Sequence, residues 1–212
     1  MHASESLAAA GETSAARPKP SFRWRVVDIV VGAVVGVAMG IVFWAWGALW
    51  GPISAPFEAL LPGLQAAPAA LWVLAGVLGG LIIRKPGAAL YVELVAATVS
   101  ALIGTQWGPL TIESGLVQGL GAELVFLIFL YRVWNLPVAV LAGAAAGLAM
   151  AINDLVLYYA GSSADFAFVY AASAVVGGAL IAGALAWFAM RGLASTGALA
   201  RFAAGRSARL VD

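Results

Sequence analysis

Thiols and imidazoles are almost missing from this sequence: it contains no cysteine, and its single histidine is His2. The lack of cysteine excludes disulfides and thiolate metal sites. One histidine, far from the apolar segments, excludes a histidine metal cluster and catalysis that needs a histidine base. The sequence also lacks the glycine-lysine loop that binds ATP phosphates. We therefore expect no enzyme, no metal and no cofactor.

Charged residues are scarce as well. They make up 10% of the chain, against roughly 25% in an ordinary soluble domain, whereas 63% of the residues are hydrophobic. Four stretches carry no charge at all, namely residues 29–57, 59–83, 133–153 and 166–190. Each is long enough for a membrane-spanning helix of about 20 apolar residues. None has the polar face that a soluble helix needs, so the lipid bilayer is the predicted environment.

Two further apolar stretches, residues 87–103 and 114–131, each contain one glutamate. Together these features predict an all-α integral membrane protein with six spanning helices, near residues 26–49, 69–83, 87–103, 112–131, 135–159 and 165–190. The proline-rich segment 50–68 is predicted to be a loop with one interfacial turn. We expect one transmembrane domain over residues 23–190. A polar, disordered tail over residues 1–22 precedes it, and a basic tail over residues 191–212, either a short surface helix or disordered, follows it.

The basic residues predict the orientation. Six spans alternate sides, and all eleven Lys and Arg residues then fall on one side, in the two tails and in the turns near residues 84 and 132. Short cytoplasmic loops carry the excess of Lys and Arg. Both termini are therefore expected in the cytoplasm, in the plasma membrane of a bacterium. The net charge of +1 indicates no nucleic-acid partner.

Glu93 and Glu123 are the carboxylates that fall inside apolar segments. A charge there costs about 2.5–3.5 kcal/mol on insertion scales, so it must be paired, neutral or facing a polar cavity. We expect both near the bilayer midplane, in a pocket open to the outside. Glu93, Glu123, Gln118 and Asn153 would face inward, with aromatic walls from Trp44, Trp46, Trp107 or Tyr158.

Such a pocket suits a flat, hydrogen-bonding and cationic ligand, because aromatic faces attract cations and a carboxylate supplies the counter-charge. The alternative is structural. The two glutamates would then only bridge helices, and the Trp and Tyr residues would anchor helix ends at the membrane interface.

Small residues form a second pattern. Gly32, Gly36 and Gly40 recur every four residues and therefore share one helical face, where a second helix can approach closely. This face could dock a separate membrane subunit, or it could pack against another helix of the same chain.

Three segments resemble the YkoE family: RKPGAA at residues 84–89 followed by Glu93, GTQWG at residues 104–108, and QGLGAELVF at residues 118–126. The resemblance extends over residues 23–190. The family consists of substrate-binding (S) components of energy-coupling-factor (ECF) transporters, associated with thiamin and its hydroxymethylpyrimidine precursor. It implies a six-helix ligand-binding subunit that works with a transmembrane coupling protein and two cytoplasmic ATPases. It also favours Gly32, Gly36 and Gly40 as the docking face for the coupling protein.

Three functional hypotheses follow. The leading one is the capture of thiamin or hydroxymethylpyrimidine outside the cell for ATP-driven uptake by partner subunits. The alternative is a stand-alone, proton-coupled secondary carrier in which Glu93 and Glu123 relay protons. The third is a scaffold that transports nothing and binds no ligand saturably.

Overall fold

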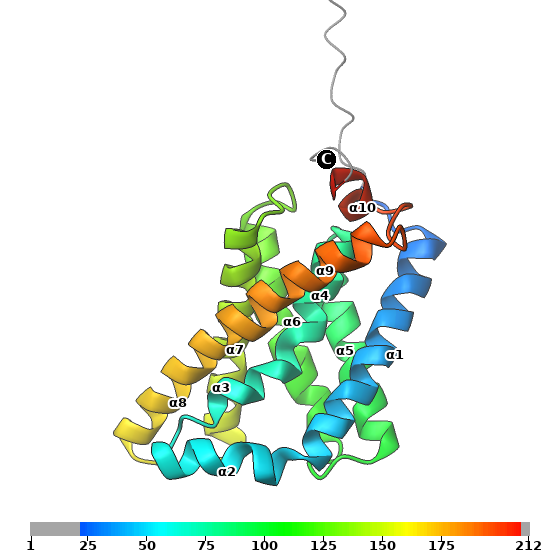
Figure 1. Cartoon of the computed structure of the whole chain (residues 1–212). Helices are drawn as coiled ribbons and strands as arrows, with labels where there is room; N and C mark the ends of the chain where they lie inside the picture. Colours follow the sequence, from blue (N-terminus) through cyan, green and yellow to red (C-terminus); the bar gives the residue numbers. More distant parts are fainter. Residues whose placement is uncertain (1–21, 209–212) are drawn as a thin grey trace, which may run out of the picture.

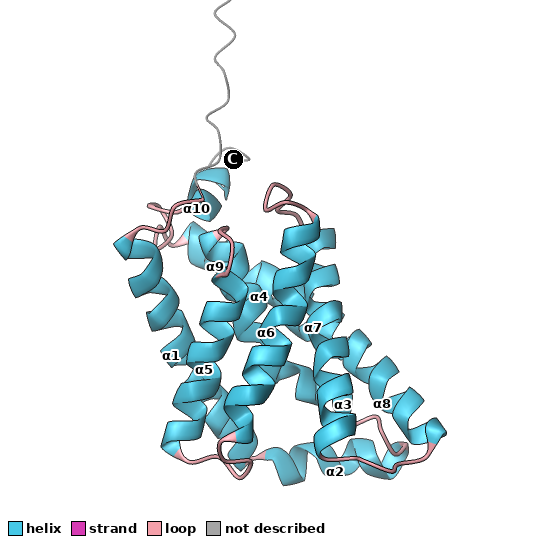
Figure 2. Cartoon of the chain, turned by 180° about the vertical axis from the view of Figure 1, so that it is seen from behind, coloured by secondary structure: helices cyan, strands magenta, loops and turns pink. Residues whose placement is uncertain are grey.

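The computed structural model describes residues 22–208, with side chains described as far as residue 205. All regular structure in this part of the chain is helical (Figure 2). The predicted amino-terminal tail lies outside the described residues except for Phe22. The elements, in chain order, are α1 Val26–Ala48, α2 Trp50–Leu60, α3 Ala66–Ala69, η1 Ala70–Val73, α4 Leu74–Ile83, α5 Ala88–Ile103, α6 Leu110–Ile128, α7 Leu136–Leu157, α8 Ala164–Gly177, η2 Gly178–Leu185, α9 Ala186–Ser195 and α10 Ala203–Ala208.

Five segments among the described residues are long and apolar enough to cross a membrane: Val26–Ala48, Ala66–Ile83, Leu110–Ile128, Leu136–Leu157 and Ala164–Ser195. α5 is a shorter apolar helix of 16 residues. At about 1.5 Å per residue it covers roughly 24 Å, less than the roughly 30 Å of a bilayer core. The predicted apolar segments are thus all helices, five of them candidate spans and one shorter.

α4 forms the centre of the bundle. All of its residues are buried, because neighbouring helices surround it on every side. Glycines make this possible: a Cβ added at Gly79 would lie 2.5 Å from a side-chain carbon of Val92, and one at Gly80 would lie 2.4 Å from the ring of Phe126. The helix begins at Ala66, through α3 and η1, three residues earlier than predicted.

Two segments differ from the sequence prediction. Residues 50–60 form the helix α2 rather than a loop, and it lies across the lower end of the bundle in Figure 1. The predicted end of the last span, residue 190, falls inside α9, which continues to Ser195. Beyond α9 the chain turns back, and Leu199 and Phe202 are buried where α10 meets α4 and α9.

The last long helix is not regular. Its middle, η2, is a π-helix, and it packs very closely against α7. A Cβ at Gly143 of α7 would lie 2.2 Å from the carbonyl oxygen of Gly178, and one at Gly147 would lie 2.2 Å from that of Ala174. Only glycine permits two backbones this close.

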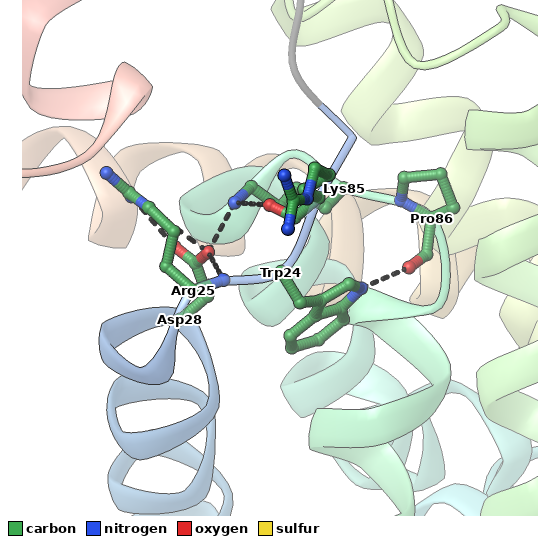
Figure 3. Close-up of polar contacts among 6 residues, drawn as sticks. Trp24, Arg25, Asp28, Lys85 and Pro86 are labelled. Carbon is green, nitrogen blue, oxygen red and sulfur yellow. Dashed lines mark hydrogen bonds and ion pairs between the residues drawn. The ribbon is translucent and has the colours of Figure 1, made fainter.

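The start of α1 is fixed to the turn between α4 and α5, at the opposite end of the bundle from α2 (Figures 1 and 3). The carboxylate of Asp28 is fully buried; it accepts a 2.7 Å hydrogen bond from the Arg25 backbone and forms ion pairs with Arg25 and Lys85. The indole of Trp24 donates to the carbonyl of Pro86 at 3.0 Å. This end carries every Lys and Arg within residues 22–208.

Candidate functional site

A cavity of about 190 Å³ opens at the α2 end of the bundle. The elements that line it meet there: the start of α2, the turn between α5 and α6, the end of α7 and the beginning of α8. Its lining combines aromatic rings with hydroxyl, amide and carboxyl groups, namely Phe43, Trp50, Ala69, Trp72, Glu93, Ala97, Ser100, Thr105, Trp107, Thr111, Ser114, Gln118, Met150, Asp154, Tyr158, Tyr159 and Tyr170.

Three tryptophans build one wall of the cavity. The ring centroids of Trp50 and Trp72 are 4.7 Å apart, and those of Trp72 and Trp107 are 4.9 Å apart with the rings nearly perpendicular. The Trp72 indole also donates to the Phe43 carbonyl at 3.1 Å, which fixes its orientation. Ring pairs at these separations attract each other beyond the burial of their area. The wall is therefore a fixed aromatic surface suited to a flat ring.

Glu93 is the deepest acidic group of the cavity and is only 1% exposed. Its Oε2 accepts a 2.6 Å hydrogen bond from the backbone N–H of Gly76. Its Oε1 is buried and has no hydrogen-bond partner among the described residues, and the same holds for the hydroxyl of Thr111, also on the lining. A buried polar atom without a partner costs about 1–3 kcal/mol. A ligand that brings an N–H or O–H donor would remove that cost.

The predicted polar neighbours of Glu93 lie close by. Gln118 lines the cavity, as do Trp107 and Tyr158. Asn153 is not part of the lining. Its amide donates a 3.1 Å hydrogen bond to the hydroxyl of Ser114, a lining residue, and a 3.3 Å hydrogen bond to Glu113. Asn153 therefore orients a lining hydroxyl from behind.

Glu123 lies elsewhere, which corrects the prediction that it faces the cavity. Its carboxylate accepts from the backbone N–H groups of Gly87, Ala89 and Leu90 at 2.6, 2.9 and 3.3 Å. Those groups begin α5, where a helix has unsatisfied donors and favours a negative charge. The hydroxyl of Tyr131 adds a 2.7 Å hydrogen bond. Burial and the nearby Glu123 charge raise the pKa of Tyr131, so its hydroxyl stays protonated as the donor.

Two tryptophans predicted as walls are also outside the cavity. Trp46 donates its indole N–H to the carbonyl of Pro68 at 3.2 Å and so ties α1 to α3. Trp44 borders a separate small hollow beside Gln106. Conversely, the sequence prediction missed Trp50, Trp72 and the group Asp154, Tyr159 and Tyr170. The pair Asn153-Asp154 followed by two tyrosines near a helix end was the signal available for that group.

The glycine face of α1 is covered by α5, so internal packing, the alternative interpretation, describes it. A Cβ at Gly32 would lie 2.8 Å from the Tyr91 ring, one at Gly36 2.6 Å from Val95, and one at Gly40 2.6 Å from Val99. A face that already holds α5 is not free for a separate subunit, which corrects the docking prediction. The exposed face of α1 is a different one and includes Val30, Val34 and Ile41.

Comparison with known proteins finds a matching family model, a relative of similar sequence and a similar solved structure. The family model described as "ABC-type cobalt transport system, permease component" matches residues 27–149, more than half of the chain. YkoE of Bacillus subtilis (strain 168), named provisionally as an HMP/thiamine permease protein, is 42% identical over 137 residues, which cover 64% of this chain and 69% of that protein.

A solved structure is also similar: the crystal structure of an S-component of an ECF transporter, with a TM-score of 0.81 and 33% identity over 88% of this chain and 94% of the other. An S component is a transport subunit that binds substrate and carries out no catalysis. The chain therefore belongs to the ABC-type cobalt transport permease-component family and is a YkoE-like S component of an ECF transporter, a multi-pass membrane protein of the bacterial type.

Proposed function

We propose that this S component captures thiamin or hydroxymethylpyrimidine outside the cell, for uptake driven by ATP hydrolysis in partner subunits. The name of the Bacillus relative supports the ligand class. The observation that carries the proposal is the unpartnered, buried Oε1 of Glu93 on a cavity with an aromatic wall. An aminopyrimidine is flat, and its amino group supplies the N–H that this oxygen lacks.

The same proposal includes a topology. Six apolar helices cross the membrane, the shorter helix α5 among them, and the end with α10 faces the cytoplasm. The basic residues of that end, among them Arg25, Lys85 and Arg132, support this direction. The cavity then opens to the outside. Residues 23–190 form the substrate-binding domain, and the partners are a transmembrane coupling protein and two cytoplasmic ATPases.

Tryptophan fluorescence of the purified protein tests the ligand, because Trp50, Trp72 and Trp107 lie on the cavity wall. We expect a saturable change with thiamin or with hydroxymethylpyrimidine at micromolar concentration. Glu93→Gln should weaken binding by roughly tenfold, since it alters the buried acceptor. Asp165→Asn, which likewise replaces a carboxylate by an amide at an exposed position in the first turn of α8, is the matched control. An unchanged signal with both compounds and with thiamin phosphates would reject the ligand assignment.

Two other outcomes would replace the proposal. Because the family model carries the name of a cobalt transporter, Co²⁺ belongs in the titration. A response to Co²⁺ and to neither organic compound would make the ligand a metal ion. Uptake in a host without the ATPase partners, abolished by collapsing the proton gradient, would instead favour the stand-alone carrier in which Glu93 relays protons.

A further inference from the structure

The two acidic groups on the cavity wall lie at different depths. Glu93 is ten residues from the α2 end of α5, whereas Asp154 is three residues from the corresponding end of α7. At about 1.5 Å per residue, the seven-residue difference places Asp154 about 10 Å nearer the opening. A single small ring cannot contact both groups, but two linked rings can.

Asp154 is held in place by Tyr170, whose hydroxyl donates to its Oδ2 at 2.7 Å. Tyr170 is itself buried and packs against Tyr159, with ring centroids 5.0 Å apart. Asp154, Tyr159 and Tyr170, which we call the outer subsite, all line the cavity. A carboxylate beside aromatic faces is the combination that binds an organic cation.

Within residues 22–208, no Lys or Arg forms an ion pair with this carboxylate. Every Lys and Arg within residues 22–208 lies at the α10 end, and the ion pairs found in that part of the chain involve Asp28. Glu113 adds a second acidic group behind Asn153. The negative charges here also act on Tyr159: burial raises the pKa of its hydroxyl, and the charges of Asp154 and Glu58 raise that pKa further. The outer subsite therefore favours a positive group supplied by the ligand.

We infer that the outer subsite recognises a permanently cationic ring, and that Asp154 makes this chain select a two-ring cation over a single neutral ring. The inference rests on the proposed function and decides between its two ligands. Thiamin joins an aminopyrimidine to a cationic thiazolium, so it satisfies Glu93 and Asp154 together. Hydroxymethylpyrimidine has the first ring alone and leaves Asp154 without a counter-charge. The family match ends at residue 149, before this subsite begins.

The test compares Asp154→Asn with Asp165→Asn, which makes the same change at an exposed site in the first turn of α8. Asparagine keeps the shape of the side chain and an acceptor for the Tyr170 hydroxyl. Tryptophan fluorescence titrations with thiamin and with hydroxymethylpyrimidine give the two dissociation constants of each variant. We expect Asp154→Asn to weaken thiamin binding on the order of tenfold and to change hydroxymethylpyrimidine binding less than about twofold. Asp165→Asn should change neither.

Several results would overturn the inference. Equal weakening of both compounds by Asp154→Asn means a structural role, and Tyr170→Phe, which removes the hydroxyl but keeps the ring, should then reproduce it. No effect on thiamin means that the cation lies elsewhere. If the unaltered protein binds hydroxymethylpyrimidine more tightly than thiamin, the inference fails while the proposed function stands. Binding of neither compound rejects the proposed function itself.

Discussion

At the scale of single residues, two glutamates with the same signal in the sequence lie in different surroundings, Glu93 on the cavity and Glu123 at the start of α5. Each lies eight or nine residues from a basic turn, so the sequence predicts equal depth for both. That estimate assumes that the helices run straight to Lys85 and Arg132. Instead, α6 ends at Ile128. Leu130 and Tyr131 then adopt positive φ angles of 53° and 54°, and Tyr131 reaches back to Glu123.

Glu123 is therefore expected to support the fold rather than the ligand. Glu123→Gln keeps one oxygen acceptor but loses the negative charge at the start of α5. It should lower the free energy of unfolding by about 1–3 kcal/mol and weaken thiamin and hydroxymethylpyrimidine binding by the same small factor. Thermal unfolding in detergent, together with the two titrations, measures both effects. A selective loss of thiamin binding would return Glu123 to the cavity.

Lys85 is expected to matter more than its partner Arg25. Lys85→Met leaves the buried charge of Asp28 short of its internal cation, and breaking such a pair costs about 3–5 kcal/mol. The Arg25 side chain is 49% exposed, so Arg25→Met should cost about 1 kcal/mol or less. Melting temperatures of the two variants check this order. Equal shifts would mean that Lys85 and Arg25 hold Asp28 to the same extent.

At the scale of elements, the length of the apolar segments predicted the long helices of the bundle. The helix α2, which lies across the end of the bundle, was not predicted because its segment is rich in proline. Pro52 stands in the first turn of α2, where a missing N–H is tolerated, but Pro56 is inside the helix. Four prolines between residues 52 and 68 therefore read as a loop. Two of the three wall tryptophans were missed, because Trp50 begins α2, which was expected to be a loop, and Trp72 belongs to η1, inside the predicted span over residues 69–83, where an apolar pattern does not show which rings face a cavity.

The contact between α1 and α5 gives an element-scale prediction. Gly36→Leu places side-chain atoms where Val95 already stands, so we expect a loss of about 1–3 kcal/mol as the helices separate. Val34→Leu adds bulk on the exposed face of the same helix and should be nearly neutral. Thermal unfolding separates the two. A stable Gly36→Leu protein that no longer joins the transporter complex would restore the docking interpretation of the glycines.

At the scale of the whole molecule, every Lys and Arg within residues 22–208 lies at the end away from the cavity opening, and the sequence predicted that these residues share one side. The direction in the membrane stays a prediction, and it follows from the Lys and Arg positions because the side on which each one falls depends only on the number of crossings. The cavity lining could not be predicted from the sequence in this way, because it depends on how α5, α7 and α8 rotate about their axes. Glu93 and Gln118 were predicted from polarity alone, whereas Tyr170 resembles any aromatic residue of an apolar helix.

The lack of native cysteine makes the direction easy to test. Ala55→Cys on α2 and Gly192→Cys on α9 each place one thiol at an exposed position, at opposite ends of the bundle. A membrane-impermeant maleimide added to intact cells should label Ala55→Cys, and it should label Gly192→Cys only after permeabilisation. The reverse pattern would turn the cavity toward the cytoplasm and end the proposal of capture from outside.

The π-helical stretch η2 has a consequence for the direction of one aromatic ring. A π-turn holds more residues than an α-turn, so deleting one residue from it would rotate everything before it by about 100° relative to everything after it. Tyr170 lies eight residues before η2 begins, and Met190 lies five residues after it ends. With α9 seated against α4, a regular helix would swing the phenol away from Asp154. The direction of the Tyr170 hydroxyl therefore depends on the extra residue in η2, about two turns further along the chain, where η2 packs against the glycines of α7.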